Sequence, residues 1–123
     1  MLLVAPFFFV GQQAIAAARE PALIQKEFEE AINLMGSSPE AAATLFGSLY
    51  QETGAPRIQL EWARSLYLAG RLSEAKEQFI DVINKEIPIT VRDKIEWYLS
   101  EIQKRQSAKV YIGVYQDTNH GYI

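Results

Sequence analysis

The feature that most constrains this chain is a glycine, Gly70, between two runs of apolar residues at helical spacing. Apolar side chains that recur every three or four positions lie on one face of an α-helix. A glycine at that place lets the chain leave the first helix in a left-handed conformation that a Cβ would penalise. Because Ala75 has little bulk, the second helix can approach the first closely, and Phe79 then fills the space between them. Residues 56–89 are therefore predicted to form a helix-turn-helix unit.

The same pattern occurs 34 positions earlier in the chain. At this offset six pairs share their physical type: Phe28 with Trp62, Ile32 with Leu66, Gly36 with Gly70, Ala41 with Ala75, Leu45 with Phe79 and Leu49 with Ile83. A period of 34 residues is that of tetratricopeptide arrays. Over residues 22–89 the chain resembles the tetratricopeptide family, which implies two helix-turn-helix repeats stacked side by side. The alternative is a plain antiparallel helical bundle whose spacing repeats by accident.

A fifth helix is predicted after the two repeats. The segment Thr90-Val-Arg-Asp93 offers a capping-box-like start. The apolar face of this helix, over residues 91–105, consists of Val91, Ile95, Tyr98, Leu99 and Ile102. Because a repeat array needs a terminal element with a polar outer surface, we expect this helix to cap the array. The predicted helical domain covers residues 22–106, and the predicted fold class is an all-α, tetratricopeptide-like helical array with a short C-terminal β-strand segment.

Residues 1–18 look like a secretory signal. The stretch from Leu2 to Val10 is apolar and uncharged, and Ala14-Ile-Ala-Ala-Ala18 offers small residues at the positions of a cleavage site. The apolar run is too short to span a bilayer, although the positive start typical of such signals is missing. We expect export, and hence a periplasmic domain in a Gram-negative cell. The alternative is a buried N-terminal helix that packs on the first repeat.

The pattern changes after Ser107. Residues 109–117 alternate, with aliphatic side chains on one face and tyrosine or glycine on the other, which predicts a β-strand. Its length is about that of a tilted transmembrane strand. Since a single strand cannot span a membrane with its backbone unpaired, the strand is expected either to pair with an edge elsewhere or to begin a β-barrel. Residues 107–123 are therefore predicted as the start of a barrel.

The order of these parts resembles a narrower family. A signal, a repeat pair, the helix Arg92-Asp-Lys-Ile-Glu-Trp-Tyr-Leu99 and then Gly113-Val-Tyr-Gln-Asp-Thr-Asn119 look like the N-terminal part of the surface lipoprotein assembly modifier family. In that family a periplasmic tetratricopeptide domain precedes an outer-membrane β-barrel that helps to deliver lipoproteins to the bacterial surface. The resemblance covers residues 22–119 and implies a lipoprotein partner and a location at the periplasm or outer membrane. The alternative is a free-standing periplasmic tetratricopeptide adaptor or scaffold for envelope assembly.

Composition and reactive residues point away from catalysis. A formal net charge of −3 offers no broad cationic surface for nucleic acid. With no cysteine, the chain has neither disulfides nor thiolate metal ligands. The sole histidine, His120, lies close to Asp117 and Asn119, but a polar turn after a strand explains these residues. Because no nucleophile has a base at a defined spacing, we expect no enzyme activity, no cofactor and no metal site.

The predicted binding surface follows from the resemblance to tetratricopeptide pairs, in which the first helix of each repeat lines a concave groove. The candidate partner-binding residues are Lys26, Glu30, Asn33, Arg57, Leu60, Arg64 and Tyr67. Aromatic and aliphatic side chains could bury part of an extended or helical peptide, and guanidinium groups could orient its carboxylates. The alternative is that Leu60 and Tyr67 pack on the N-terminal segment or on a neighbouring helix.

Overall fold

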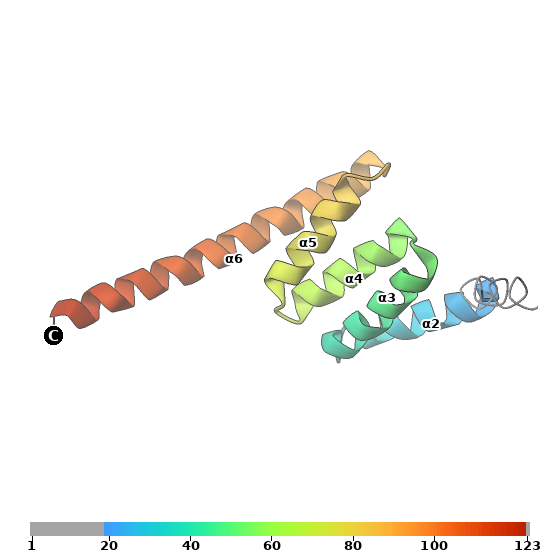
Figure 1. Ribbon diagram of the computed structural model, residues 1–123, viewed down its shortest axis with the longest axis horizontal. Coiled ribbons are helices and arrows are strands. Elements are labelled where there is room, and N and C mark those ends of the chain that lie inside the picture. Colours follow the sequence, from blue (N-terminus) through green and yellow to red (C-terminus); the bar gives the residue numbers. More distant parts are fainter. Residues whose placement is uncertain (1–18, 123) are drawn as a thin grey trace, which may run out of the picture.

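The computed structural model describes residues 19–122, and side chains as far as residue 108. The described chain consists of five helices: α2 (Pro21–Leu34), α3 (Pro39–Thr53), α4 (Pro56–Leu68), α5 (Leu72–Ile83) and α6 (Ile89–Tyr122) (Figure 1). Each helix packs against the next one along the chain. The all-α prediction is therefore confirmed as a packed helical array. The signal predicted at residues 1–18 lies outside the described residues.

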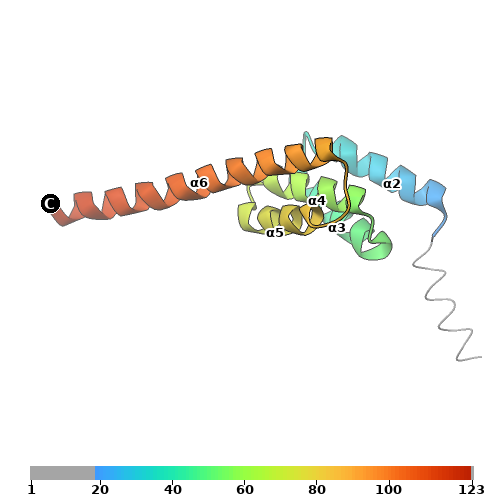
Figure 2. The ribbon, with the colours of Figure 1, turned by 90° about the horizontal axis from the view of Figure 1, so that it is seen from above.

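The helices divide between two faces of the array. Figure 2 shows α2 and α6 along one face and α3 and α5 along the other, with α4 between them. Residues of α4 belong both to the apolar cluster that includes α2 and to the cluster that includes α6.

No helix within residues 19–122 is both long enough and apolar enough to cross a bilayer.

Prolines and glycines set the helix boundaries. Helices α2, α3 and α4 each have proline in the first turn, where its fixed φ suits the helix and its missing N–H would have no partner. Gly70, after α4, has φ 80°. The N–H of Gly70 donates to the carbonyl of Tyr67 at 3.0 Å, and the N–H of Arg71 donates to that of Leu66 at 2.9 Å. These two bonds form a Schellman motif, so the predicted left-handed exit at Gly70 is confirmed.

The second helices of the two pairs match at an offset of 33, one less than predicted. Three pairs of core residues have at most 2% of their surface exposed: Ala42 and Ala75, Phe46 and Phe79, and Leu49 and Val82. The predicted pairing of Ala41 with Ala75 is wrong by one residue, since Ala41 is only half-buried. The cause is the length of the turn. Helix α3 begins three residues after Gly36, whereas α5 begins two residues after Gly70, so the first turn is one residue longer.

The core has two apolar clusters that share α4. In the first, between α2, α3 and α4, the rings of Phe28 and Phe46 meet edge to face at 5.6 Å. In the second, between α4, α5 and α6, the rings of Phe79 and Tyr98 stack with centroids 4.8 Å apart. Trp62 of α4 packs against both clusters. The two helix pairs are thus joined through one central helix.

The capping helix predicted over residues 91–105 is present as the first part of α6, with Ile95 and Ile102 fully buried. The strand predicted over residues 109–117 is wrong, because these residues continue α6 to Tyr122. Extending a formed helix adds one hydrogen bond for each residue fixed. A strand would need a second strand to pair with, and residues 19–122 contain none. Both views show the end of α6 extending beyond the other helices (Figures 1 and 2).

Candidate functional site

The seven predicted partner-binding residues fall into three separate groups in the structure. Lys26, Glu30 and Asn33 are exposed on α2, Arg57 and Leu60 lie in the first turns of α4, and Arg64 and Tyr67 lie further along α4. Arg57 and Leu60 line a pocket between α4, α5 and α6. The structure therefore brings these two predicted residues together at one site.

The group on α2 faces away from the rest of the array. Lys26, Glu30 and Asn33 share one side of the helix by their spacing, and Phe28 and Met35 lie on the opposite side. Phe28 and Met35 belong to the cluster with α3 and α4. The three polar residues therefore form a solvated helix face.

The group at the end of α4 holds α6 in place. The Nε of Arg64 donates to the hydroxyl of Tyr98 at 3.1 Å, and Arg64 also pairs with Glu61. Burial lowers the pKa of Arg64, but the hydrogen bond to Tyr98 and the charge of Glu61 outweigh burial, so the pKa is raised. Tyr67 is 6% exposed, with its ring 5.0 Å from that of Tyr98 and the guanidinium of Arg105 at 4.7 Å. Tyr67 therefore packs on a neighbouring helix, α6, as the alternative interpretation of this residue predicted.

A partly enclosed pocket of about 300 Å³ lies where the start of α4, the end of α5 and the start of α6 meet. It is lined by Pro56, Arg57, Leu60, Val82, Glu86, Ile87, Pro88 and Val91. The lining is mostly apolar, and Leu60 is 9% exposed. A volume of this size lies at the lower end of known ligand pockets, roughly 300–1,000 Å³. The pocket can therefore take a single large side chain.

Two charged residues line this pocket, and they differ in their surroundings. The guanidinium of Arg57 lies 5.5 Å from the centroid of the Phe28 ring, and no ion pair holds it among the side chains described. By contrast, Arg19 and Arg71 each pair with a glutamate. Glu86 is exposed in the connection to α6. Arg57 is therefore positioned on an aromatic ring with its hydrogen-bonding capacity still available.

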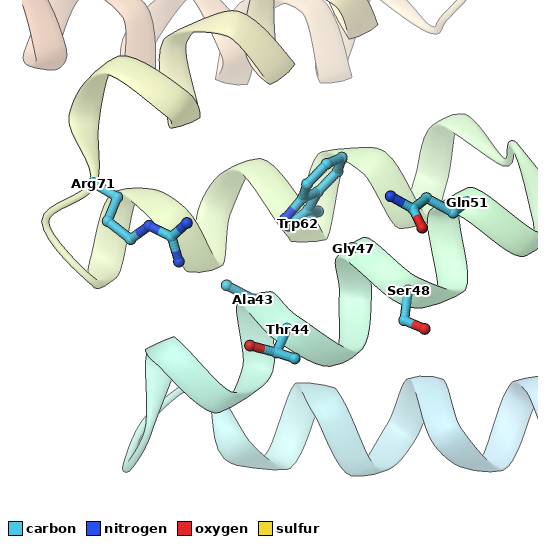
Figure 3. Close-up of a pocket in the computed structure, with 7 residues that line it drawn as sticks. All are labelled: Ala43, Thr44, Gly47, Ser48, Gln51, Trp62 and Arg71. Atoms are coloured by element: carbon cyan, nitrogen blue, oxygen red, sulfur yellow. The ribbon is translucent and has the colours of Figure 1, made fainter.

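A second, more open groove of about 310 Å³ lies between α3 and α4. Figure 3 shows the indole of Trp62 reaching across to α3 above Gly47, with Arg71 at one end of the groove. A Cβ at Gly47 would lie 3.1 Å from two indole atoms of Trp62, so the glycine permits this close approach. Arg71 already pairs with Glu40 and Glu74, so the charged residue of this groove, unlike Arg57, has carboxylate partners within the chain.

Sequence reasoning missed the pocket residues from α5, α6 and their connection. Val82, Ile87 and Pro88 fall within the helix-turn-helix unit predicted over residues 56–89, and Val91 falls on the predicted apolar face of the capping helix. The segment Ile87-Pro88-Ile89 could have indicated the pocket, because a connection between two helices is usually polar and this one is apolar. Within the described residues, no three or more His, Asp or Glu side chains are grouped to bind a metal ion; the predicted turn around His120 lies beyond the described side chains.

No family model, no curated protein and no solved structure matches this chain.

Proposed function

We propose that this chain is a protein-interaction module made of two tetratricopeptide-like helix pairs capped by α6. The observation that carries the proposal is the accessible apolar pocket between α4, α5 and α6, with Arg57 beside it. The matched burial of Phe46 and Phe79 at equivalent places in α3 and α5 supports the repeat. Such arrays bind segments of other proteins through surfaces formed by several helices.

The lining of the pocket favours binding over catalysis. Apart from Arg57 and Glu86 it consists of proline and aliphatic residues. These groups can bury a side chain and orient a charge. They offer no nucleophile with a neighbouring base, which group-transfer chemistry requires.

Site-specific photo-crosslinking in cells that naturally produce the protein tests the module. A benzophenone amino acid in place of Glu86 should form a covalent adduct with a partner protein, because this exposed position borders the pocket and leaves Arg57 intact. The matched control is Lys76, which is exposed on α5 and is not among the residues that line the pocket. The same reagent at Lys26 tests whether α2 takes part. No adduct at position 86, or equal adducts at positions 86 and 76, would overturn the proposed binding face.

A narrower proposal is that the module is periplasmic and serves a lipoprotein-delivery protein of the outer membrane. Its support is the resemblance of the repeat pair and of the Arg92–Leu99 helix to the surface lipoprotein assembly modifier family. In α6 this motif buries Ile95 and packs Tyr98 on Phe79, but leaves Trp97 54% exposed. Residues 109–122 are helical, so they give the proposal no support as a first barrel strand.

Two measurements test the narrower proposal. Cell fractionation with an antibody against residues 19–108 should find the protein in the periplasm or the outer membrane. Sequencing the coding frame beyond Ile123 should reveal further segments with alternating polarity of about ten residues each. A stop codon directly after Ile123 together with a periplasmic location would favour the free-standing adaptor. A cytosolic location would remove both versions.

A further inference from the structure

From the walls and charges of the pocket between α4, α5 and α6, we infer that it takes one large aliphatic side chain of a partner protein whose carboxylate, close to that side chain, pairs with Arg57. This inference rests on the proposed function and names the chemistry that the module recognises. Three features of the described residues carry it: the apolar walls, the charge of Arg57 and the start of α6.

The walls select an aliphatic side chain. Leu60 of α4, Val82 of α5 and Val91 of α6 come from three different helices and converge on the pocket. Rings of Pro56 and Pro88 complete the lining. A side chain that enters leaves water for an apolar surface, with a gain that grows with the area buried. A leucine should therefore bind more tightly than an alanine.

The charged residues around the pocket favour a partner carboxylate on the side of Arg57. Arg57 lines the pocket, rests on Phe28 and has no carboxylate partner among the described side chains. The N-terminus of α6 carries partial positive charge, and Val91 in its first turn, whose N–H donates to the carbonyl of Pro88 at 3.0 Å, lines the pocket. Glu86 would repel a carboxylate that bound on its own side. The partner's carboxylate is therefore oriented toward Arg57.

Titration of the ¹⁵N-labelled protein with three small probes, followed by NMR, tests the inference. N-acetyl-leucine carries both groups, N-acetyl-leucinamide lacks the carboxylate, and N-acetyl-alanine lacks most of the side chain. N-acetyl-leucine should shift the amide resonances of Leu60, Val82 and Val91. The amide should bind about two- to fivefold more weakly, as expected for loss of an exposed ion pair. The alanine probe should bind about tenfold more weakly or more.

Variants test which residues cause the preference for a carboxylate and the preference for a large aliphatic side chain. Arg57→Gln should abolish the preference for N-acetyl-leucine over its amide, while the control Lys94→Gln, exposed on α6, should keep it. Val91→Phe should fill the pocket and weaken all probes, and its dispersed spectrum would show that it remains folded. Equal binding of acid and amide by the native protein, or no shifts at the pocket, overturns the inference even if Val91→Phe fails to fold.

The small probes also separate this inference from the proposed function. Pocket shifts with N-acetyl-leucine, but no crosslinked partner at position 86, would keep the pocket chemistry and remove the interaction module. A crosslinked partner, but no preference for the acid, would keep the module and remove the inferred chemistry.

Discussion

At the scale of single residues, glycines that are equivalent in the sequence have different conformations in the structure. Gly70 and Gly36 occupy the same place in the two predicted repeats. Gly70 has φ 80°, whereas the only other positive φ in residues 19–122 belongs to Gly54, at 65°. A Cβ added at Gly36 would meet no atom within 4 Å. The left-handed backbone conformation that favours glycine therefore occurs at Gly70 and Gly54, and not at Gly36.

This difference predicts opposite effects of the same substitution. Gly70→Ala should lower the free energy of unfolding by about 1–2 kcal/mol, because an L-residue is strained in the left-handed region. Gly36→Ala should leave it unchanged or raise it by up to about 1 kcal/mol, because alanine restricts the unfolded chain. Urea unfolding followed by circular dichroism measures both. Equal losses in the two variants would contradict the assigned turn geometry.

Arg19, just before α2, forms ion pairs with two glutamates, Glu27 and Glu52. Its Nε and Nη2 donate to Glu52 at 2.6 and 2.8 Å, and its Nη1 and Nη2 donate to Glu27 at 2.7 and 2.8 Å. These hydrogen bonds lower the pKa of both carboxyl groups. A carboxylate with a lowered pKa stabilises the fold above its unfolded pKa, and the stabilisation is lost as the pH falls through the folded pKa.

The native protein should therefore melt at a higher temperature than Arg19→Gln at pH 7, and the difference should shrink as the pH falls below about 4, near the usual pKa of glutamate. Lys94→Gln, whose residue is exposed on α6, controls for the change in net charge. Thermal melts at several pH values provide the comparison. A difference that stays constant down to pH 2 would show that Arg19 acts by something other than these two carboxylates.

At the scale of elements, a buried amide connects α3, α4 and α5. Gln59 of α4 is 1% exposed. Its Nε2 donates to Gln78 at 2.8 Å and to Asp81 at 2.7 Å, both on α5, and its Oε1 accepts from Lys85 at 2.6 Å. Lys85 also donates to the hydroxyl of Tyr50 on α3 at 2.8 Å. Every polar atom of Gln59 is thus used within the array.

Replacing this amide should loosen three helices at once. Gln59→Ala removes the hydrogen bonds and leaves a void, so we expect a loss of about 2 kcal/mol in the free energy of unfolding. Gln78→Ala, at a partly exposed position of the same network, should cost clearly less because water can replace its bond. Urea unfolding compares them. Similar costs for the two variants would mean that burial of Gln59 contributes nothing.

The sequence predicts those parts of the elements that depend on local chemistry. The exit at Gly70, the proline starts and the apolar face of α6 follow from backbone preferences and helical period. The one-residue shift of α3 depends on the length of a turn, and the burial of Tyr67 depends on how α6 packs against α4. The spacing of apolar residues within one helix carries no information on either. The strand prediction failed at residues 109–117 because alternation is a strand signal only where a pairing partner exists.

At the scale of the whole molecule, α6 has two parts that contribute differently. Its first part covers the second core cluster through Ile95 and Ile102, which are fully buried. Among the side chains described, the hydrogen bond nearest the C-terminus joins Gln106 to Ser73 of α5 at 3.3 Å. Beyond it the helix extends past the array in both views (Figures 1 and 2). The cap is therefore expected to end near residue 106.

Two changes in α6 test this division. Ile102→Ala should cost about 2–5 kcal/mol, because it opens a cavity in the second cluster, and should lower the melting temperature by several degrees. A chain that ends after Ala108 should melt within about 2 °C of the full chain, since it keeps every described core contact. Circular dichroism melts compare both with the native protein. If the shortened chain melts as early as Ile102→Ala, residues 109–123 must contribute to the stability of the array, and the cap would extend along the whole of α6.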